Sequence, residues 1–225
     1  MPDRYEIETH YYPALLNSIP FLLLGYYFLS NIDSAFWSHA ATATIGGIGI
    51  ASALYWLQMS MCRAVGKVLE DRIFDSGKKM PTTELMLTSD SRCSPDRKNS
   101  IASKVEKDFG IRLKGRLEDT NDDRIFINEA VGQIRTKMGR KNALISQRNR
   151  QYGFVRNMLG GALLAEIASL LGVVISIAAN NNTALNLAIV FAVIYGVVAA
   201  VMFMLLRFTG VQYAMALYDE YLASK

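Results

Sequence analysis

The sequence predicts an all-α integral membrane protein with four transmembrane helices in two hairpins and a small, mainly helical cytosolic domain inserted between them. Two observations lead to this prediction. The first is the stretch from Asn157 to Leu206, in which Glu166 is the only strongly acidic or basic side chain. The second is the distribution of positive charge, because 21 of the 24 Lys and Arg residues lie between Arg63 and Arg156. Long uncharged stretches and a basic insert are typical of polytopic membrane proteins.

The four predicted spans follow from the thickness of a bilayer. A helix needs roughly 20 predominantly apolar residues to cross a hydrocarbon core of about 30 Å. Four segments meet this requirement, at residues 13–29, 44–62, 158–179 and 184–206. The last two are separated by Asn180, Asn181 and Asn182. Asparagine tolerates turn backbone, so we expect a tight helical hairpin there.

The basic residues also predict the orientation and the division of the chain. Only Arg4, Arg207 and Lys225 lie outside the basic insert, and the other two connections between spans carry no Lys or Arg. The positive-inside bias therefore predicts a multi-pass protein of the inner (plasma) membrane with its insert and both termini in the cytoplasm. We expect four parts: a tail and first hairpin at 1–62, a cytosolic domain at 63–156, a second hairpin at 157–207 and an amphipathic cytosolic tail at 208–225.

Helix-end signals predict two short amphipathic helices within the insert. Ser94 and Pro95 are typical of an N-cap followed by a proline in the first turn. The first helix then ends at Gly110, and its apolar face comprises Ile101, Val105 and Phe109. The second begins near residues 119–123 and ends at Gly139, with Ile127, Val131, Ile134 and Met138 on one face. The apolar segment 80–87 is compatible with either a strand or a helix.

The residue types that most catalytic and metal sites require are scarce. The chain has two histidines, His10 and His39, and the predicted topology places them on opposite sides of the membrane. No Cys pair has metal-ligand spacing, and no glycine-rich loop follows a nucleotide-binding pattern. We therefore expect a protein that is not an enzyme and that holds neither a metal nor a cofactor.

The charge of the insert favours membrane lipids over nucleic acid as a partner. The insert carries 21 basic and 13 acidic residues, with the two signs interspersed and without a row of aromatic residues. Binding to single-stranded nucleic acid would require such aromatic residues for base stacking. The positive-inside bias and attraction to anionic lipid already account for the excess positive charge.

Glu166 is the leading candidate for a functional residue within the membrane. A carboxyl group in the hydrocarbon region is costly, so it is either functional or well partnered. Two interpretations stay open: a protonated carboxyl that is hydrogen-bonded within the bundle, and a position on a proton or ion pathway. The polar side chains predicted at similar or neighbouring depths are Tyr55, Gln58, Asn17 and Tyr195.

Two further groups of residues are candidates for contacts. The densest basic cluster is a candidate contact for an anionic ligand or lipid, and it comprises Arg135, Lys137, Arg140, Lys141, Arg148 and Arg150. Small residues let membrane helices approach closely. The small residues expected to pack helices in this way are Ala43, Gly47, Ala51 and Gly172.

These features favour a non-enzymatic membrane sensor or effector. Its cytosolic domain would receive a protein, nucleotide or other anionic signal and couple it to oligomerisation or repacking of the membrane bundle. The concrete form that we favour is a homo-oligomeric effector of immunity or anti-phage defence that perturbs the membrane, an inference that rests on architecture alone. Two alternatives stay open: a small oligomeric ion channel or transporter that uses Glu166, and a membrane anchor for a soluble partner enzyme.

Overall fold

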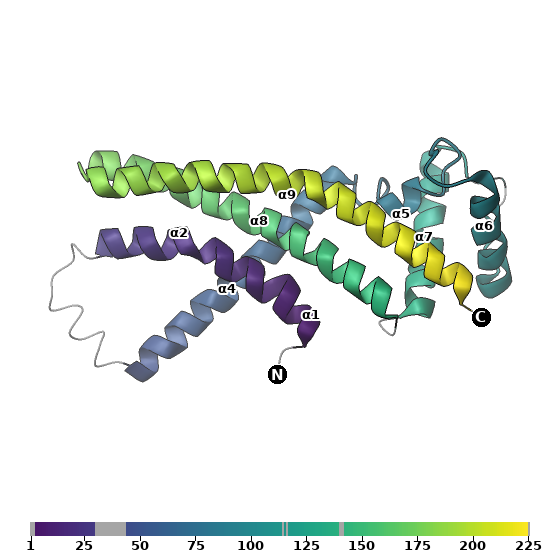
Figure 1. Ribbon diagram of the computed structural model, residues 1–225, viewed down its shortest axis with the longest axis horizontal. Helices are drawn as coiled ribbons and strands as arrows, with labels where there is room; N and C mark the ends of the chain where they lie inside the picture. The colour runs from purple at the N-terminus through teal and green to yellow at the C-terminus, as the bar shows by residue number, and fades with distance from the viewer. Residues whose placement is uncertain (1–2, 30–43, 114, 116, 140–141, 225) are drawn as a thin grey trace. The chain divides into compact units, whose positions relative to one another are not determined.

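The computed structural model shows a chain of helices joined by turns (Figure 1). It describes residues 3–29, 44–113, 115, 117–139 and 142–224, and every regular element in these ranges is a helix. The all-α class predicted from the sequence is confirmed for these residues. The segment 80–87 contains the short helix α5 (Pro81–Glu84), which decides between the two alternatives for that segment.

The N-terminal segment is a continuous run of three helical elements. A short helix, α1 (Arg4–Glu6), begins at Asp3, whose side chain accepts a hydrogen bond from the backbone N–H of Glu6 at 2.7 Å. A π-helical stretch, η1 (Ile7–Tyr11), follows and leads into α2 (Tyr12–Leu29). The helix α2 contains Pro20, which has no N–H to donate within the helix.

Three long helices make up much of the remaining chain: α4 (Thr44–Ile73), α8 (Ala143–Ala178) and α9 (Asn182–Ala223). Among the described residues, α8 and α9 are long and apolar enough to fit membrane spans. Only 33% of the apolar window of α8 and 17% of that of α9 is buried within the protein. A core helix of a soluble protein buries most of its apolar surface, so this exposure favours contact with hydrocarbon.

Two shorter helices have the ends that the sequence predicts. In α6 (Pro95–Phe109), Ser94 Oγ accepts from the backbone N–H of Arg97 at 3.3 Å, and Gly110 ends the helix with φ of 70°. In α7 (Asn121–Met138), Thr120 Oγ1 accepts from the backbone N–H of Asp123 at 3.1 Å. These bonds satisfy donors that the first turn of a helix leaves unpaired.

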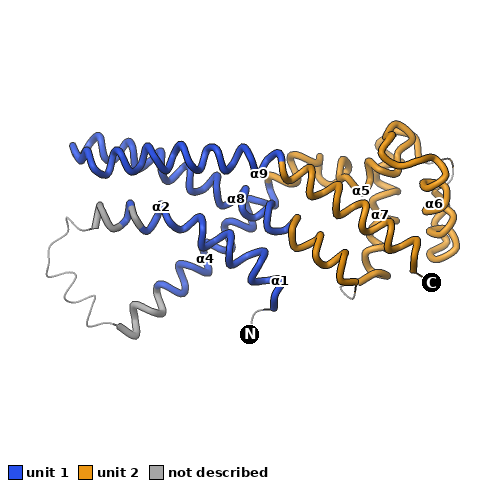
Figure 2. Tube along the Cα trace, viewed as in Figure 1, with its two compact units in different colours: residues 1–68, 153–204 blue, residues 69–152, 205–225 orange. Residues whose placement is uncertain are grey.

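The chain divides into two compact units (Figure 2). Unit 1 comprises residues 1–68 and 153–204, and unit 2 comprises residues 69–152 and 205–225. The helices α4, α8 and α9 each contribute residues to both units. Residues 208–223, most of the predicted tail, form the end of α9 and belong to unit 2.

Unit 2 has the larger buried core. The predicted apolar faces of α6 and α7 supply Ile101, Val105, Ile127, Val131 and Ile134, each at most 1% exposed. The end of α9 adds Ala214, Leu217, Tyr218 and Tyr221, which are equally buried. Full burial of one large apolar side chain stabilises a fold by roughly 1.5–3 kcal/mol. The end of α9 is therefore a structural part of unit 2.

Candidate functional site

Glu166 lies on α8 with its carboxyl group against α9. It is half-buried, and its Oε2 atom is buried and has no hydrogen-bond partner among the described residues. A Cβ atom placed on Gly196 of α9 would lie 3.7 Å from each carboxylate oxygen. The carboxyl group therefore lies beside Gly196, at a distance where an added methyl group would make ordinary van der Waals contact. An unpaired buried polar oxygen carries a desolvation cost, which is unusual in a native structure.

The same face of α8 carries small and polar side chains that are buried. Ala162 and Ser169 are 0% exposed and Ser176 is 1% exposed, as expected for positions four, three and ten residues from Glu166 on a helix. Ser169 Oγ donates to Ala165 O at 2.7 Å, whereas the buried Ser176 Oγ has no partner in the described part of the chain. Two unsatisfied oxygens, one from Glu166 and one from Ser176, therefore lie on this face.

The polar residues predicted near the depth of Glu166 bind the N-terminal helices. Tyr55 Oη donates to Tyr11 O at 2.7 Å, and Gln58 Nε2 donates to Ala14 O at 3.3 Å. The fully buried Asn17 donates through Nδ2 to Pro13 O at 2.6 Å. None of the hydrogen bonds seen for these side chains goes to Glu166.

Tyr195 supplies a hydrogen-bond donor in place of the N–H group that Pro20 lacks. In an α-helix the backbone N–H of residue 20 would donate to the carbonyl oxygen of Leu16, and proline removes that donor. Tyr195 Oη supplies a substitute and donates to Leu16 O at 2.5 Å. Membrane helices tolerate proline where a neighbouring helix satisfies the freed carbonyl group.

Asn157 makes a similar contact that the sequence analysis missed. Its Nδ2 atom donates to Thr9 O at 2.7 Å, four residues before Pro13, which also lacks an N–H group. Asn157 is 1% exposed. The available signal was the pair of prolines Pro13 and Pro20, because each predicts a carbonyl group in need of an outside donor.

Glycines bring α4 and α8 into close backbone contact. A Cβ atom on Gly160 would overlap the backbone of Cys62 and lie 2.8 Å from Gly66 Cα. A Cβ atom on Gly66 would lie 2.5 Å from Arg156 O. This contact is not among the helix-packing positions predicted from the sequence.

The small residues expected to pack helices have mixed positions. Gly172 is buried, and an added Cβ atom would lie 2.9 Å from Leu24 Cδ1 and 3.4 Å from Ala188 Cβ. Ala51 is exposed. Ala43 and the surroundings of Gly47 lie outside the described residues.

Four members of the predicted basic cluster are described, and each has a local contact. Lys137 forms an ion pair with Asp108 at 2.7 Å, and Arg135 lies over the ring of Tyr213 at 5.7 Å. Within α8, Arg148 Nη1 donates to Gln151 Oε1 and Arg150 Nη1 donates to Ser146 Oγ, both at 3.1 Å. Arg140 and Lys141 lie outside the described residues. Each described member of the cluster thus contacts a residue of the chain itself, and the anionic ligand or lipid stays a prediction.

The ion pair of Lys137 also fixes the end of α9. Asp108 accepts a second hydrogen bond from Tyr221 Oη at 2.8 Å. The hydrogen bonds from Lys137 and Tyr221 hold the pKa of Asp108 below its usual value. Burial raises the pKa of Tyr221, so its phenol stays protonated at neutral pH and acts as the donor. These groups therefore have a structural role.

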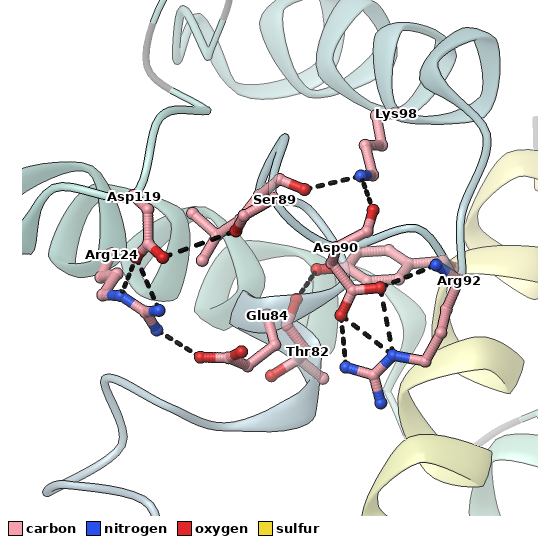
Figure 3. Close-up of polar contacts among 10 residues, drawn as sticks. Thr82, Glu84, Ser89, Asp90, Arg92, Lys98, Asp119 and Arg124 are labelled. Atoms are coloured by element: carbon pink, nitrogen blue, oxygen red, sulfur yellow. Dashed lines mark hydrogen bonds and ion pairs between the residues drawn. The ribbon is translucent and has the colours of Figure 1, made fainter.

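A network of charged side chains holds the loop between α5 and α6 in unit 2 (Figure 3). The buried Lys98 donates through Nζ to Leu87 O at 2.6 Å and also to Asp90 O. Arg92 Nε donates to both carboxylate oxygens of Asp90, at 3.1 and 2.9 Å. On the other side, Arg124 pairs with Glu84 and, at 2.7 Å, with Asp119. These charge-assisted hydrogen bonds hold the loop in place.

Comparison of the chain with protein-family models, curated proteins and solved structures gives no match. Within the described residues, no three His, Cys, Asp or Glu side chains are grouped so that they could hold a metal ion. Function must therefore be argued from the contacts above.

Proposed function

We propose that this protein is a non-enzymatic membrane effector in which unit 2 receives a signal and unit 1 is the membrane bundle that responds by oligomerising or repacking. The proposal includes four spans, cytoplasmic termini and a homo-oligomeric active form. Perturbation of the membrane in immunity or anti-phage defence is the concrete role proposed.

The observation that carries the proposal is that α9 is one continuous helix from an apolar, membrane-length segment into the core of unit 2. This helix contains the uncharged residues 182–206, and its end supplies Leu217, Tyr218 and Tyr221 to the core of unit 2. A ligand that changes the packing of unit 2 would therefore act on the same helix that crosses the membrane. Such a change requires only that the ligand bind one arrangement more tightly than another.

A change in the backbone stiffness of α9 tests this coupling. Phe208 and Thr209 lie on α9, and Phe208 is 60% exposed. The double variant Phe208→Gly, Thr209→Gly weakens the helix by about 1 kcal/mol per glycine relative to alanine. We expect it to lose the dye leakage that the wild type causes in liposomes and its effect on cell growth, while membrane insertion is kept.

The matched control is Phe208→Ala, Thr209→Ala, which removes the same side chains and keeps the helix. The control should stay active. Equal activity of the glycine and alanine variants would contradict coupling through α9. An inactive wild type in both assays would contradict the effector role.

The proposed orientation can be tested with single cysteines. The native Cys62 and Cys93 are buried, so both are first replaced by alanine. Ser91 and Asn182 are exposed and suit the substitutions Ser91→Cys and Asn182→Cys. In intact cells an impermeant thiol reagent should label only the variant at 182, and the opposite result would reverse the topology.

The unpaired carboxyl oxygen of Glu166 favours a second candidate function, an ion or proton pathway through the bundle. Intramembrane carboxyl groups without protein partners commonly mark such pathways. The substitution Glu166→Gln keeps the shape and removes the charge. We expect it to fold normally and to lose ion flux in liposomes. The control is Glu129→Gln on the exposed surface of α7, which should conduct normally. Unchanged flux in Glu166→Gln leaves the residue a structural role only.

A further inference from the structure

Unit 2 contains an open cavity of about 260 Å³ that is lined by three cationic side chains, Lys79, Arg92 and Arg207. Its apolar lining includes Phe74, Pro81 and Val211. The residues come from the end of α4 and the turn after it, from the segment around α5, and from α9. None of the three cations belongs to the basic cluster predicted from the sequence.

The side chains that line the cavity carry a net charge of +2, because three cations line it with one acidic residue, Glu84. Glu84 pairs with Arg124, whose side chain is 13% exposed and also contacts Asp119. Figure 3 shows the Glu84 carboxylate directed to Arg124 and the Arg92 side chain beside Asp90. Arg92 uses Nε and Nη2 on Asp90, and Nη1 has no partner among the described residues.

Lys79 and Arg207 have fewer hydrogen-bond and ion-pair partners than Arg92. Lys79 lies 3.9 Å from Asp75, and both side chains are more than half exposed, so this pair contributes little. Arg207 is exposed and makes no hydrogen bond or ion pair with any described residue. Lys79, Arg207 and Nη1 of Arg92 can therefore all serve an anion.

The chemistry of these groups fits phosphate. Guanidinium groups bind phosphate oxygens in a fork geometry, and a lysine ammonium binds them as a point charge. The volume is below the range of about 300–1,000 Å³ that holds drug-sized ligands. The cavity therefore suits a phosphate with a small substituent better than a whole nucleotide.

The place of Arg207 in the sequence indicates where this phosphate comes from. Residues 182–206 contain no Asp, Glu, Lys or Arg, so Arg207 marks the end of the uncharged part of α9. Val211 lies one helical turn further, about 6 Å along the axis. The headgroup layer on each side of a bilayer is roughly 5–8 Å thick. If α9 spans the membrane as in the proposed function, the cavity lies at the level of the headgroups.

We propose that this cavity binds the phosphate-bearing headgroup of an anionic phospholipid. Lys79, Arg92 and Arg207 contact the phosphate oxygens, and the apolar lining at Phe74, Pro81 and Val211 contacts the glycerol and the start of the acyl chains. The proposal rests on the proposed membrane position of α9 and identifies the lipid as an anionic ligand of unit 2.

The test is a binding measurement on the full-length protein in detergent. Phosphatidylglycerol and phosphatidylcholine are added separately, and bound lipid is counted by native mass spectrometry. The variant is Lys79→Gln, Arg207→Gln, which removes two charges without breaking a close ion pair. Because each basic residue near a membrane surface is worth about 1 kcal/mol toward anionic lipid, we expect phosphatidylglycerol affinity to fall about tenfold or more. Phosphatidylcholine binding should not change.

The matched control is Lys107→Gln, Arg112→Gln, which removes two exposed charges that do not line the cavity. It should retain phosphatidylglycerol affinity within about twofold. An equal loss in variant and control would overturn the proposal, because the lipid would then respond to total charge. Unchanged binding by Lys79→Gln, Arg207→Gln would also overturn it.

Soluble competitors distinguish the source of the phosphate. Inorganic phosphate and ATP should not displace phosphatidylglycerol at equal concentration, and displacement would overturn the assignment to lipid. The measurement does not need leakage activity. A wild type that binds phosphatidylglycerol at this cavity but causes no leakage would contradict the effector function and leave the lipid site intact.

Discussion

In unit 1 the polar side chains between helices donate to backbone carbonyl groups, whereas in unit 2 most of them bind other side chains. Tyr55, Asn157 and Tyr195 of unit 1 each bind a carbonyl oxygen of η1 or α2. In unit 2, Arg124, Lys137 and Arg97 each pair with a carboxylate. The two units contain the same kind of secondary structure, so the difference lies in their surroundings.

The contrast follows from the cost of desolvation. Charged pairs lose much of their hydration energy when they are removed from water, and their attraction does not always repay it. A neutral donor from one helix to the carbonyl group of another avoids most of that cost. Unit 1, with its exposed apolar helices, uses the second kind of bond, and the buried atoms Glu166 Oε2, Ser176 Oγ and Asn17 Oδ1 stay without a partner among the described residues.

The largest effect should come from separating α4 and α8 in unit 1. In Gly160→Leu the new side chain would overlap the backbone of Cys62 and Gly66. Backbone cannot move aside as a side chain can, so we expect a loss of about 3 kcal/mol or more. The measurement is the rate at which buried Cys62 reacts with a thiol reagent, resolved by mass spectrometry. Gly25→Leu is the control, because nothing lies within 4 Å of its Cβ position. Equal reactivity in both variants would disprove the close contact.

The next effect tests whether the end of α9 belongs to unit 2. Leu217 is 0% exposed in the core of that unit, so Leu217→Ala should cost about 2–5 kcal/mol. Cys93 is buried in the same unit and should react faster, while Cys62 should keep its wild-type rate. Phe208→Ala, at a position 60% exposed on α9, should change stability by no more than about 0.5 kcal/mol. An unchanged rate for Cys93 in Leu217→Ala would show that α9 does not stabilise unit 2.

A smaller effect on stability tests whether Tyr195 replaces the donor that Pro20 lacks in unit 1. Tyr195→Phe removes the donor to Leu16 O and should cost about 0.6–1.7 kcal/mol, the range found between membrane helices. Pro20→Ala restores an N–H group that can donate to the same oxygen. In that background Tyr195→Phe should cost less than half as much. Additive effects in this double-mutant cycle would argue against substitution of one donor by the other.

The smallest effect concerns pH and the ion pairs of unit 2. The hydrogen bonds from Arg92 hold the pKa of Asp90 below its usual value of 3.8. A carboxyl group with a lowered pKa in the folded state stabilises it above the unfolded pKa, and this stabilisation is lost as pH falls through the folded pKa. Asp90→Asn should therefore be less stable than the wild type at pH 7, and the difference should shrink as the pH falls below about 4 and disappear once the pH is below the folded-state pKa. A difference that stays constant across this range would mean that the Asp90 charge is not involved.

Local features of unit 2 could be predicted from the sequence with good accuracy. The cap at Ser94, the end at Gly110 and the buried face of Ile127, Val131 and Ile134 all appear in the structure. These features depend on residues a few positions apart, so spacing is enough to predict them. The partners of Tyr55 and Tyr195 could not be predicted in this way, because each of these hydrogen bonds joins two segments far apart in the sequence.

The sequence by itself determined the helical class, two membrane-length apolar helices and the position of the short helices α6 and α7 that precede them, because each depends on hydrophobic length and local backbone preference. Only the tertiary structure decided that Gly160 and Gly66 bring two helices together, that Gly196 lies beside the Glu166 carboxyl group, and that Lys79, Arg92 and Arg207 line one cavity. These residues are far apart along the chain. The distances between them depend on how the helices pack, which the spacing along the sequence does not determine.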